Sequence, residues 1–484
     1  MSNEINPMAF FQEPSVADLR LLACPGAEEL TKLIDQHLVE WAKSAGVEKD
    51  SFIIPCECPR FQSGDAKGLV KESVRGDDIF IVVDPGNYSV TYKLFNYENH
   101  LSPDDHFANL KRLIQAVAGK AHRVSVIMPS LYGGRQHRRV SRESLDCAVA
   151  LQELQAMGIS NIVTFDAHDP RMQNAVPLMG FDNVMPTYQV LKAMLRAVPD
   201  LQLDRDHFMV ISPDEGAMNR NMYYASVLGV NLGMFYKRRD YSQVVNGRNP
   251  IVAHEYLGES VEGKDVFVAD DIISSGESML DIAYALKKQG AKRIFANATY
   301  AIFTNGLDSF DKAYADGMIT GVFGSNLTYR TPELLSRPWF HEVDVSKYIA
   351  YFIAALNHDL SVSAIIPRKD QGSARTHRTG PLSIFLRFYR KARCFYSGPL
   401  VFRRFSALDQ RSVVKSGLWG YNQDKIKTAR QSRRAGRNRM DARYTGEQIA
   451  AARRAKGLTH KQLADALGVT DKAVSKWERG ESNK

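Results

Sequence analysis

The sequence is short of the residues that build disulfide frameworks, metal ribbons and membrane spans. It has five cysteines among 484 residues, and Cys56 and Cys58 form a lone C-x-C without a second pair. This spacing favours idle thiols in a reducing cytoplasm over a disulfide scaffold or a cysteine metal site. No apolar run approaches the roughly 18 residues that span a bilayer, and residues 1–15 lack the basic start and apolar core of a secretory signal. We therefore expect a cytoplasmic protein without a membrane segment.

Acidic residues are scarce in one region only. Residues 366–444 hold 20 Lys and Arg against 4 Asp and contain no Glu, whereas residues 1–365 carry 35 basic and 45 acidic side chains. The net charge of +9 therefore belongs to the tail, and nothing in the body indicates general nucleic-acid binding. Because residues 366–444 show no sustained hydrophobic period, we interpret them as a basic, disordered linker. A nucleic-acid-binding arm and a junction of unrelated coding sequence are the alternatives.

Apolar β-prone runs alternate with segments of helical spacing along the body of the chain. The runs predicted to be strands are 78–84, 123–129, 161–165, 208–211, 232–236, 266–269 and 293–299. Such alternation predicts an α/β fold with two doubly wound, parallel-sheet halves. The predicted domains are residues 1–195, 196–365, the linker 366–444 and a small all-α tail at 445–484.

The stretch from Val266 to Met279 carries the densest chemistry. A buried strand is followed by Asp270 and Asp271, then by a turn rich in hydroxyls, then by a helix. Hydroxyls, a glycine and the free N–H groups of a helix start suit a phosphate. Ionised carboxylates accept hydrogen bonds, so the acidic pair suits sugar hydroxyls or a metal ion. An ordinary strand–turn–helix with polar loop residues is the alternative interpretation.

Polar residues follow the ends of several other predicted strands. Five strand ends carry a charge or an imidazole: Arg135, His168, Asp214, Lys237 and Asp270. Open parallel sheets bind ligands at the edge where the strands end. The pattern therefore predicts one site assembled from several loops.

Motifs in the same order resemble those of the ribose-phosphate pyrophosphokinase family (phosphoribosyl pyrophosphate synthetases). They are R-F-x-x-G-D at Arg60, E-S-V-R-G-D-D-I-F-I at Glu72, G-R-Q-H-R-R at Gly134, D-A-H at Asp166, S-P-D-x-G at Ser212, K-R-R at Lys237, D-D-I-I-S-S-G-E-S at Asp270 and G-A-K-R-I-F-A-N-A-T at Gly290. The resemblance implies halves of phosphoribosyltransferase type and transfer of the diphosphoryl group of ATP to O1 of ribose 5-phosphate, with Mg²⁺. It also implies a homo-oligomer, because the ATP site of the family is built between subunits.

The resemblance implies a role for each matching residue. For ATP it implies binding by Phe61, Asp65, Arg135, Gln136 and His168. For ribose 5-phosphate it implies Asp270, Asp271, Ser274, Ser275, Gly276 and Ser278. Lys237 and Arg239 would stabilise charge on the transferred group, and His168 and Asp214 would position the metal.

The chain also departs from the family pattern. His137 stands where Asp is usual, and Ser63 replaces an Asp in the adenine loop. The usual phosphate loop D-T-G-G-T is S-S-G-E-S here, with Ser274 and Glu277 as the main changes, and the segment Pro85 to Pro103 is longer than expected.

Residues 445–484 resemble the helix-turn-helix of the Cro and phage-repressor type. Thr459 and Thr470 are placed as N-caps, and Gly468 and Gly480 end the helices. By this resemblance the second helix enters the major groove of DNA. The side chains expected to face DNA are Gln462, Thr470, Lys472, Ser475 and Lys476. A small helical hairpin with a solvated basic face is the alternative.

Two other functions remain open at this point. One is a phosphoribosyltransferase that consumes the diphosphate product, which the loop at Asp270 alone would fit. The other is a catalytically weak or inactive homologue that acts as a nucleotide-sensing regulator and could bind DNA. Lys237 and Arg239 favour an enzyme, whereas Ser274, Glu277 and the tail favour a regulator.

Overall fold

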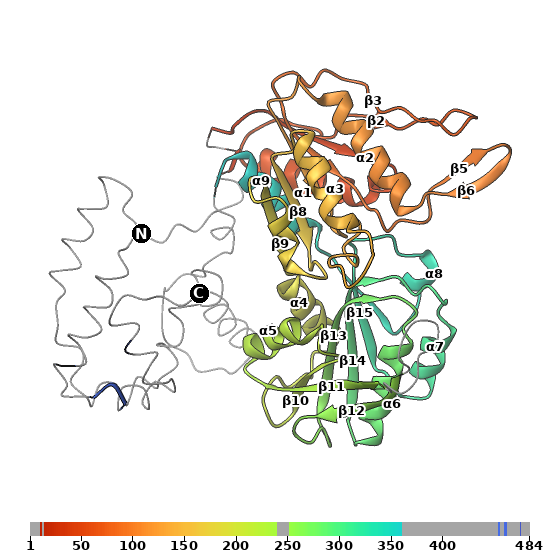
Figure 1. The fold of residues 1–484 in the computed structure, drawn as a ribbon, viewed down its shortest axis with the longest axis vertical. Coiled ribbons are helices and arrows are strands. Elements are labelled where there is room, and N and C mark those ends of the chain that lie inside the picture. The colour runs from red at the N-terminus through yellow and green to blue at the C-terminus, as the bar shows by residue number, and fades with distance from the viewer. Residues whose placement is uncertain are drawn as a thin grey trace. The chain divides into compact units, whose positions relative to one another are not determined.

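A computed structural model describes residues 10–11, 14–239 and 251–360, together with 454, 459–461 and 475. The chain divides into two compact units, Met1–Ser397 and Gly398–Lys484. The first unit has the predicted α/β architecture, with two sheets stacked end to end (Figure 1). None of the helices in the described part of the chain combines the length and apolarity of a membrane span.

The first sheet has five parallel strands in the order β1-β4-β7-β8-β9. Their bounds are Leu19–Ala23, Asp78–Val82, Arg123–Ile127, Asn161–Phe165 and Gly180–Val184. Helices α2 (Pro103–Val117) and α3 (Asp146–Ala156) bury apolar side chains against one face. Helices α1 (Glu28–Ser44) and α9 (Ser346–Asn357) cover the other face.

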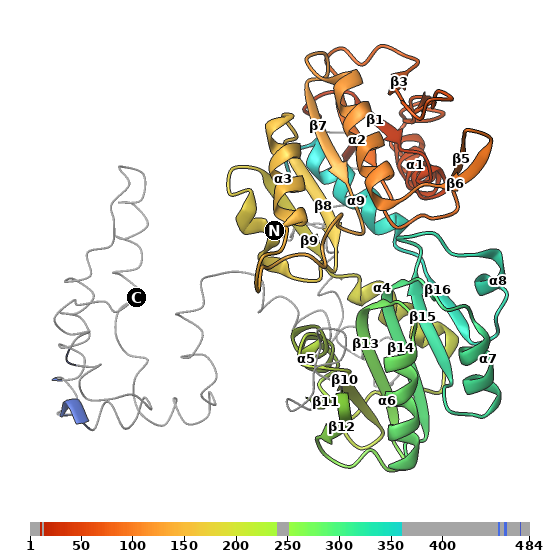
Figure 2. The same cartoon turned by 45° about the vertical axis from the view of Figure 1, so that its right-hand side comes forward.

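The second sheet has seven strands in the order β12-β11-β10-β13-β14-β15-β16. In chain order, β10 to β16 span Phe208–Ser212, Asn231–Arg239, Ile251–Leu257, Asp265–Ile273, Arg293–Ala301, Gly321–Ser325 and Phe340–Val343. Helices α6 (Glu277–Lys288) and α7 (Asp308–Ala315) cover one face, and α4 (Thr187–Ala197) and α5 (Met218–Leu228) cover the other (Figure 2). Six strands are parallel, and the edge strand β12 runs antiparallel to β11, which the alternating pattern did not predict.

The carboxyl ends of the two sheets face each other. The Tyr300 hydroxyl, at the end of β14, donates to the carbonyl oxygens of Pro129 and Phe165, which follow β7 and end β8. The Asp84 carboxylate, which follows β4, accepts from the Thr328 hydroxyl at 3.1 Å and from the Tyr329 amide at 2.9 Å, beyond the end of β15. The edges that bind ligands in open parallel sheets therefore meet at one interface.

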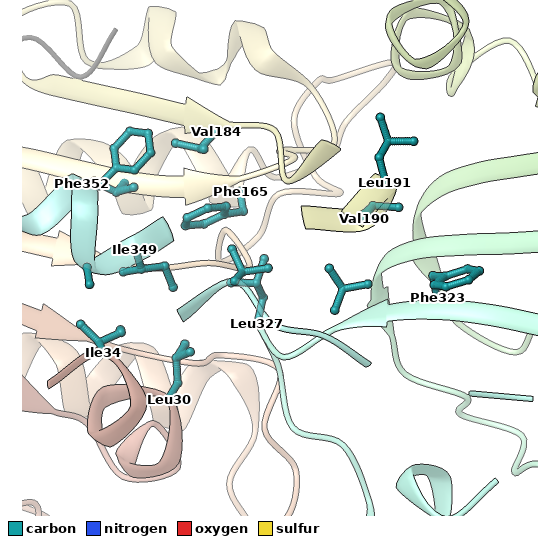
Figure 3. Close-up of a cluster of buried hydrophobic side chains, with 14 of the residues drawn as sticks. Leu30, Ile34, Phe165, Val184, Val190, Leu191, Phe323, Leu327, Ile349 and Phe352 are labelled. Carbon is teal, nitrogen blue, oxygen red and sulfur yellow. The ribbon is translucent and has the colours of Figure 1, made fainter. Parts of the chain in front are cut away.

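One hydrophobic core runs through this interface. Figure 3 shows Phe165 and Val184 of the first sheet and Leu327 and Phe323 of the second within the same buried cluster. A contiguous buried core of this kind fixes the two sheets relative to each other. The gap between their carboxyl ends is thus set by packing as well as by hydrogen bonds.

Two helices cross the predicted division of the body. Helix α4 spans residue 195, where the sequence placed a boundary, and packs on β15 and β16 of the second sheet. Helix α9 ends the second half in sequence, yet it packs on α1, with the rings of Trp41 and Tyr351 4.6 Å apart. The predicted boundary at residue 195 lies inside α4, and the limits at 365 and 444 lie outside the described residues.

The long segment after β4 forms a hairpin. Strands β5 (Thr91–Leu94) and β6 (Tyr97–His100) pair antiparallel, and the turn residues Phe95 and Asn96 have φ of 49° and 67°. A smaller pair, β2 (Cys56–Glu57) and β3 (Leu69–Val70), flanks the predicted adenine loop. Arg60 stacks on Tyr92 of the hairpin, with its guanidinium 4.1 Å from the ring centre, so the hairpin supports that loop.

Candidate active site

The site begins where β8 and β13 end. His168 lies in the loop after β8, and its Nδ1 donates a hydrogen bond of 2.7 Å to Oδ2 of Asp271 on β13. This hydrogen bond raises the pKa of His168 and outweighs burial, which alone would lower it. With its Nδ1 proton held by Asp271, the imidazole has a fixed orientation. The structure therefore joins the predicted ATP side to the predicted sugar side.

The acidic pair lies inside a strand instead of after one. The sequence predicts a strand over 266–269 followed by Asp270 and Asp271, but β13 continues to Ile273. The extension has a physical cause, because β14 is equally long and its Tyr300 and Ala301 pair with Ile272 and Ile273. The β-ladder therefore carries both carboxylates to the interface.

Arg220 of α5 gathers three carboxylates. Its Nε lies 2.9 and 2.8 Å from the two oxygens of Asp166, and its two terminal nitrogens lie 3.4 Å from Asp270 and 4.0 Å from Asp271. The Arg220 side chain is only 9% exposed. Burial alone would lower its pKa, but the charges of Asp166 and Asp271 raise it, so the guanidinium stays charged. One cation thus faces three acids in a water-poor place.

The sequence interpretation missed Arg220. The sequence did contain one signal: Asp166, Asp270 and Asp271 lie at the ends of two predicted strands, and no positively charged residue had been assigned to neutralise these three carboxylates. A buried carboxylate is rarely left without a charged or hydrogen-bonding partner. An arginine near the start of the helix after Asp214 was therefore a reasonable partner to seek.

The two neighbouring carboxylates of β13 ionise differently. Burial, followed by the charge of Asp271, raises the pKa of Asp270 well above its usual range. Burial also opposes ionisation of Asp271, but the hydrogen bond with His168 and the charge of Arg220 outweigh it and hold that pKa below its usual range. Asp271 therefore stays ionised and only accepts hydrogen bonds, whereas Asp270 takes up a proton more readily than Asp271 does.

The hydroxyl loop leads into helix α6 through a left-handed glycine. Gly276 has φ of +86°, and a Cβ built there would lie 2.3 Å from a ring carbon of Phe310. No side chain among the described residues caps the N-terminus of α6, which leaves its first N–H groups for an anion. The Asn305 amide donates to the Glu277 carboxylate at 3.4 Å, and Glu277 is exposed. Ser274 and Ser275 are half-buried, and Ser278 is exposed.

The loops after β7 and β10 border the same cluster. The pKa of His168 is raised overall, and the positive charge of Arg135 is one of the smaller influences that oppose this rise. The negative charge of Asp214 adds to the rise in the pKa of Asp270. The Asp214 carboxylate accepts from the Ala217 amide at 3.0 Å, and the Gln136 amide donates to the Ser144 carbonyl at 2.9 Å. Arg135 and Asp214 therefore lie within electrostatic reach of the acidic pair and the imidazole.

Two groups of predicted residues are not brought into this cluster by the described structure. Phe61 and Asp65 lie in the loop between β2 and β3, away from β13 (Figure 1). Phe61 is 54% exposed, and the Asp65 carboxylate accepts from the Ser63 hydroxyl at 2.9 Å. Lys237 and Arg239 lie on β11, next to β10, but their side chains are outside the described residues.

The residues at the carboxyl edge fit a magnesium ion bound mainly through a substrate. No group of three or more His, Cys, Asp or Glu is arranged to hold a metal among the residues that the structure describes. Mg²⁺ usually keeps waters and takes one or two carboxylates together with substrate phosphates, so a full protein cage is not needed. The carboxylate of Asp214 and the excess of acid over Arg220 provide the oxygen donors and the negative charge for such an ion.

Comparison with known proteins identifies the body of the chain. Residues 19–158 match the model of the N-terminal domain of ribose phosphate pyrophosphokinase, and residues 187–310 match that of the phosphoribosyl transferase domain. The chain is a divergent ribose-phosphate pyrophosphokinase homologue.

The curated relatives match over nearly their whole length. The ribose-phosphate pyrophosphokinase of Vibrio parahaemolyticus is 27% identical over 356 residues, which cover 72% of this chain and 99% of that protein. The Pasteurella multocida enzyme is 27% identical over 355 residues, with the same coverage. The crystal structure of phosphoribosylpyrophosphate synthetase from Mycobacterium smegmatis shares the fold, with a TM-score of 0.56, 20% identity and coverage of 70% and 98%.

The helix-turn-helix prediction for the tail of this homologue is also confirmed. Residues 449–484 match a helix-turn-helix family model. Four of the five side chains expected to face DNA, Gln462, Thr470, Lys472 and Lys476, lie outside the described residues. The fifth, Ser475, is helical and half-buried.

One departure from the family pattern, at His137, lies beside His168. His137 has its ring centre 5.2 Å from that of His168, and its Nε2 is 3.6 Å from a carboxylate oxygen of Asp169. A second imidazole therefore borders the cluster where the family usually has a carboxylate. The change of charge and donor type falls on the ATP side of the predicted site.

Proposed function

We propose that the chain is a ribose-phosphate diphosphokinase, which transfers the β,γ-diphosphoryl group of ATP to O1 of ribose 5-phosphate. The observation that carries the proposal is the bond between His168 and Asp271, 2.7 Å long, which joins the ends of β8 and β13. A phosphoribosyltransferase needs only the β13 side. A shared cluster between two α/β halves suits two substrates that must react with each other.

On the acceptor side, Asp271 accepts hydrogen bonds from the sugar hydroxyls, and Asp270 contributes its own oxygen atoms and proton. The N–H groups at the start of α6 and the hydroxyls of Ser274, Ser275 and Ser278 hold the 5-phosphate. Gly276 lets the backbone approach that phosphate closely. The Glu277 side chain faces Asn305 and not the phosphate, so its negative charge does not repel the phosphate.

On the donor side, Arg135 and Gln136 hold ATP, while His168 and Asp214 orient it together with Mg²⁺. Bound Mg²⁺ would offset the charge of the phosphates. The O1 hydroxyl of the sugar attacks the β-phosphorus and releases its proton to solvent. The bond between this phosphorus and the oxygen that bridges to the α-phosphorus breaks, and AMP leaves with that oxygen. Lys237 and Arg239 stabilise the charge on the transferred group, so positioning and electrostatics supply the rate without a covalent intermediate.

The adenine loop belongs to a second copy in this proposal. Phe61 is exposed and lies away from the cluster of its own chain, which suits stacking on an adenine held by a neighbour. Asp65 accepts a hydrogen bond from the base. The protein would then act as a homo-oligomer in the cytoplasm.

The deciding experiment follows AMP. The purified full chain is incubated with ATP and Mg²⁺, with and without ribose 5-phosphate, and AMP and the phosphoribosyl diphosphate are quantified. We expect equal amounts of both, and none when the sugar phosphate is omitted. No AMP from well-folded protein would remove the enzyme assignment, and AMP without the sugar would indicate a hydrolase. Lys237→Ala should abolish turnover with ATP binding retained, whereas Lys264→Ala, at the opposite edge, should not.

We propose in addition that the tail binds DNA, a function favoured by the helix-turn-helix match at residues 449–484. Lys472 and Lys476 would contact the duplex, so binding should weaken as salt rises. A pool of random duplexes is selected on the full chain, and the bound fraction is compared with that of the double variant Lys472→Ala and Lys476→Ala. Equal retention by both proteins would contradict this addition.

A further inference from the structure

Arg220 differs from an ordinary structural arginine in what surrounds it. Its partners are three carboxylates: Asp166 follows β8 of the first sheet, and Asp270 and Asp271 lie on β13 of the second. Three carboxylates around one guanidinium leave an excess of negative charge if all are ionised. This excess of negative charge lies where the hydroxyls of the acceptor sugar would bind, and the carboxylates can accept hydrogen bonds from them.

Asp166 shows how the arrangement is held on the side of the first sheet. It has φ of +44°, a left-handed conformation that is uncommon outside glycine and asparagine. Its carboxylate is fixed twice, by Nε of Arg220 and by the Thr299 hydroxyl at 2.7 Å. Because His168 follows two residues later, the direction of the β8 loop depends on these bonds.

Asn221, the neighbour of Arg220, fixes the helix that carries it. The Asn221 side chain is fully buried, and its amide nitrogen donates to the Ala269 carbonyl at 2.7 Å while its oxygen accepts from the Ala269 amide at 3.2 Å. This pair of bonds ties α5 to β13 just before Asp270. Arg220 is thus presented to the carboxylates from a rigid position.

We propose that Arg220 is a positioning residue for the acceptor sugar, which acts by holding the carboxylates of Asp270 and Asp271 against the end of β8. The proposal rests on the diphosphokinase function proposed above. Without Arg220 the three acids repel one another, and the acidic pair turns towards solvent. Binding of an anionic sugar phosphate should suffer more than binding of ATP, because ATP has its own contacts on the loops after β7 and β10.

The test separates the Michaelis constants for the two substrates. Arg220→Gln should raise the KM for ribose 5-phosphate by about 10-fold or more and lower kcat, while the KM for ATP changes by less than about 3-fold, because an interaction with a charged group is lost on one side only. Arg220→Lys keeps the charge but not the fork that reaches two acids, so it should restore part of the lost affinity. Equal changes in both KM values, or none, would overturn the proposal.

Two controls keep the result interpretable. Arg123→Lys alters a similar clamp at the opposite edge of the first sheet, and it should lower thermal stability without changing either KM. Thr299→Val removes one bond to Asp166 without a change of charge, so it should raise the KM for the sugar phosphate by about 2- to 5-fold. If the Arg220 variants do not fold, an unchanged KM in Thr299→Val contradicts the proposal. If the wild-type protein releases no AMP at all, the diphosphokinase function itself has failed, which is a different outcome.

Discussion

The amino and carboxyl edges of the two sheets use the same residue types in different proportions. At the amino edges, Arg123 begins β7 and pairs with Asp78 at 2.9 and 2.6 Å, and Arg293 begins β14 and pairs with Asp265 at the same two distances. The two pairs occupy matching register positions in the two halves. At the carboxyl edge, Arg220 meets Asp166, Asp270 and Asp271 together.

The ratio of acidic to basic groups distinguishes an ion pair that stabilises the fold from a cluster that can bind a ligand. In each amino-edge pair one guanidinium covers one buried carboxylate through two bonds, and the further partners Asp359 and Asp200 are solvent-exposed. Such pairs fix strand register without leaving charge in the interior. At the carboxyl edge, buried acid exceeds base, and burial together with the charge of Asp271 raises the pKa of Asp270. Surplus buried charge is unfavourable for stability, and its presence indicates a place that binds hydroxyls or cations.

The largest expected effect lies at the amino edge and concerns stability. Asp78→Asn leaves the partly buried Arg123 without its carboxylate, and breaking a buried ion pair costs about 3–5 kcal/mol in the free energy of unfolding. Urea unfolding of this variant should therefore show a much lower midpoint. Turnover at a temperature where the variant is folded should equal that of the wild type. A changed KM would contradict the view that the amino edge contributes only to stability.

Asp271→Asn should have the opposite profile. It removes the negative charge and one of the two acceptor oxygens that serve His168 and the sugar, and the loss of charge-assisted hydrogen bonds should lower kcat/KM for ribose 5-phosphate by about 100-fold. Stability should fall less than in Asp78→Asn, because the new amide keeps one acceptor oxygen for His168 and Arg220 keeps Asp166 as its closest partner. Initial rates and thermal unfolding, measured on the same preparation, check both parts, and a strong loss of stability would speak for a fold role.

Much of this comparison could be anticipated from the sequence. The apolar runs at 161–165 and 266–269 with polar residues after them were enough to predict that His168 and the acidic pair share an edge. The imbalance of acid indicated that a cation was needed, but the pairing of Arg220 with Asp166 itself could not be predicted, because it joins a helix of the second half to a loop of the first, 54 positions apart. The return of α9 to α1 and the antiparallel β12 depend on equally distant contacts, and the period of a sequence carries no information about them.

Gly276→Ala tests the phosphate loop at the carboxyl edge. The added methyl group meets the ring of Phe310 and must adopt a positive φ, so we expect a loss of about 1–3 kcal/mol in unfolding free energy. Because the start of α6 shifts, the KM for ribose 5-phosphate should rise as well. Gly263→Ala is the matched control, since it also has a positive φ but a Cβ there meets nothing within 4 Å. Equal KM values in the two variants would argue against a phosphate at α6.

Asp84 offers the smallest effect, through pH. Burial raises its pKa to about 6 from 3.8, so between these values the folded state binds the proton more tightly than the unfolded state does. Protonation of Asp84 thus adds about 1 kcal/mol of stability as the pH falls from 7 to 5, and this is lost again as the pH rises through 6. The free energy of unfolding of the wild type, measured relative to that of Asp84→Asn, should therefore increase by about 1 kcal/mol as the pH falls from 7 to 5. A difference that is independent of pH would contradict the raised pKa.

The most direct measurement compares two aspartates of a single strand. Asp265 begins β13 at the amino edge, and Asp271 lies near its carboxyl end. Asp265→Asn and Asp271→Asn are measured for unfolding free energy and for AMP released per minute in the presence of ribose 5-phosphate. We predict that Asp265→Asn loses more stability and keeps its turnover, while Asp271→Asn loses less stability and loses its turnover. The reverse pattern, or two variants that behave alike, would contradict the assignment of the site to the carboxyl edge.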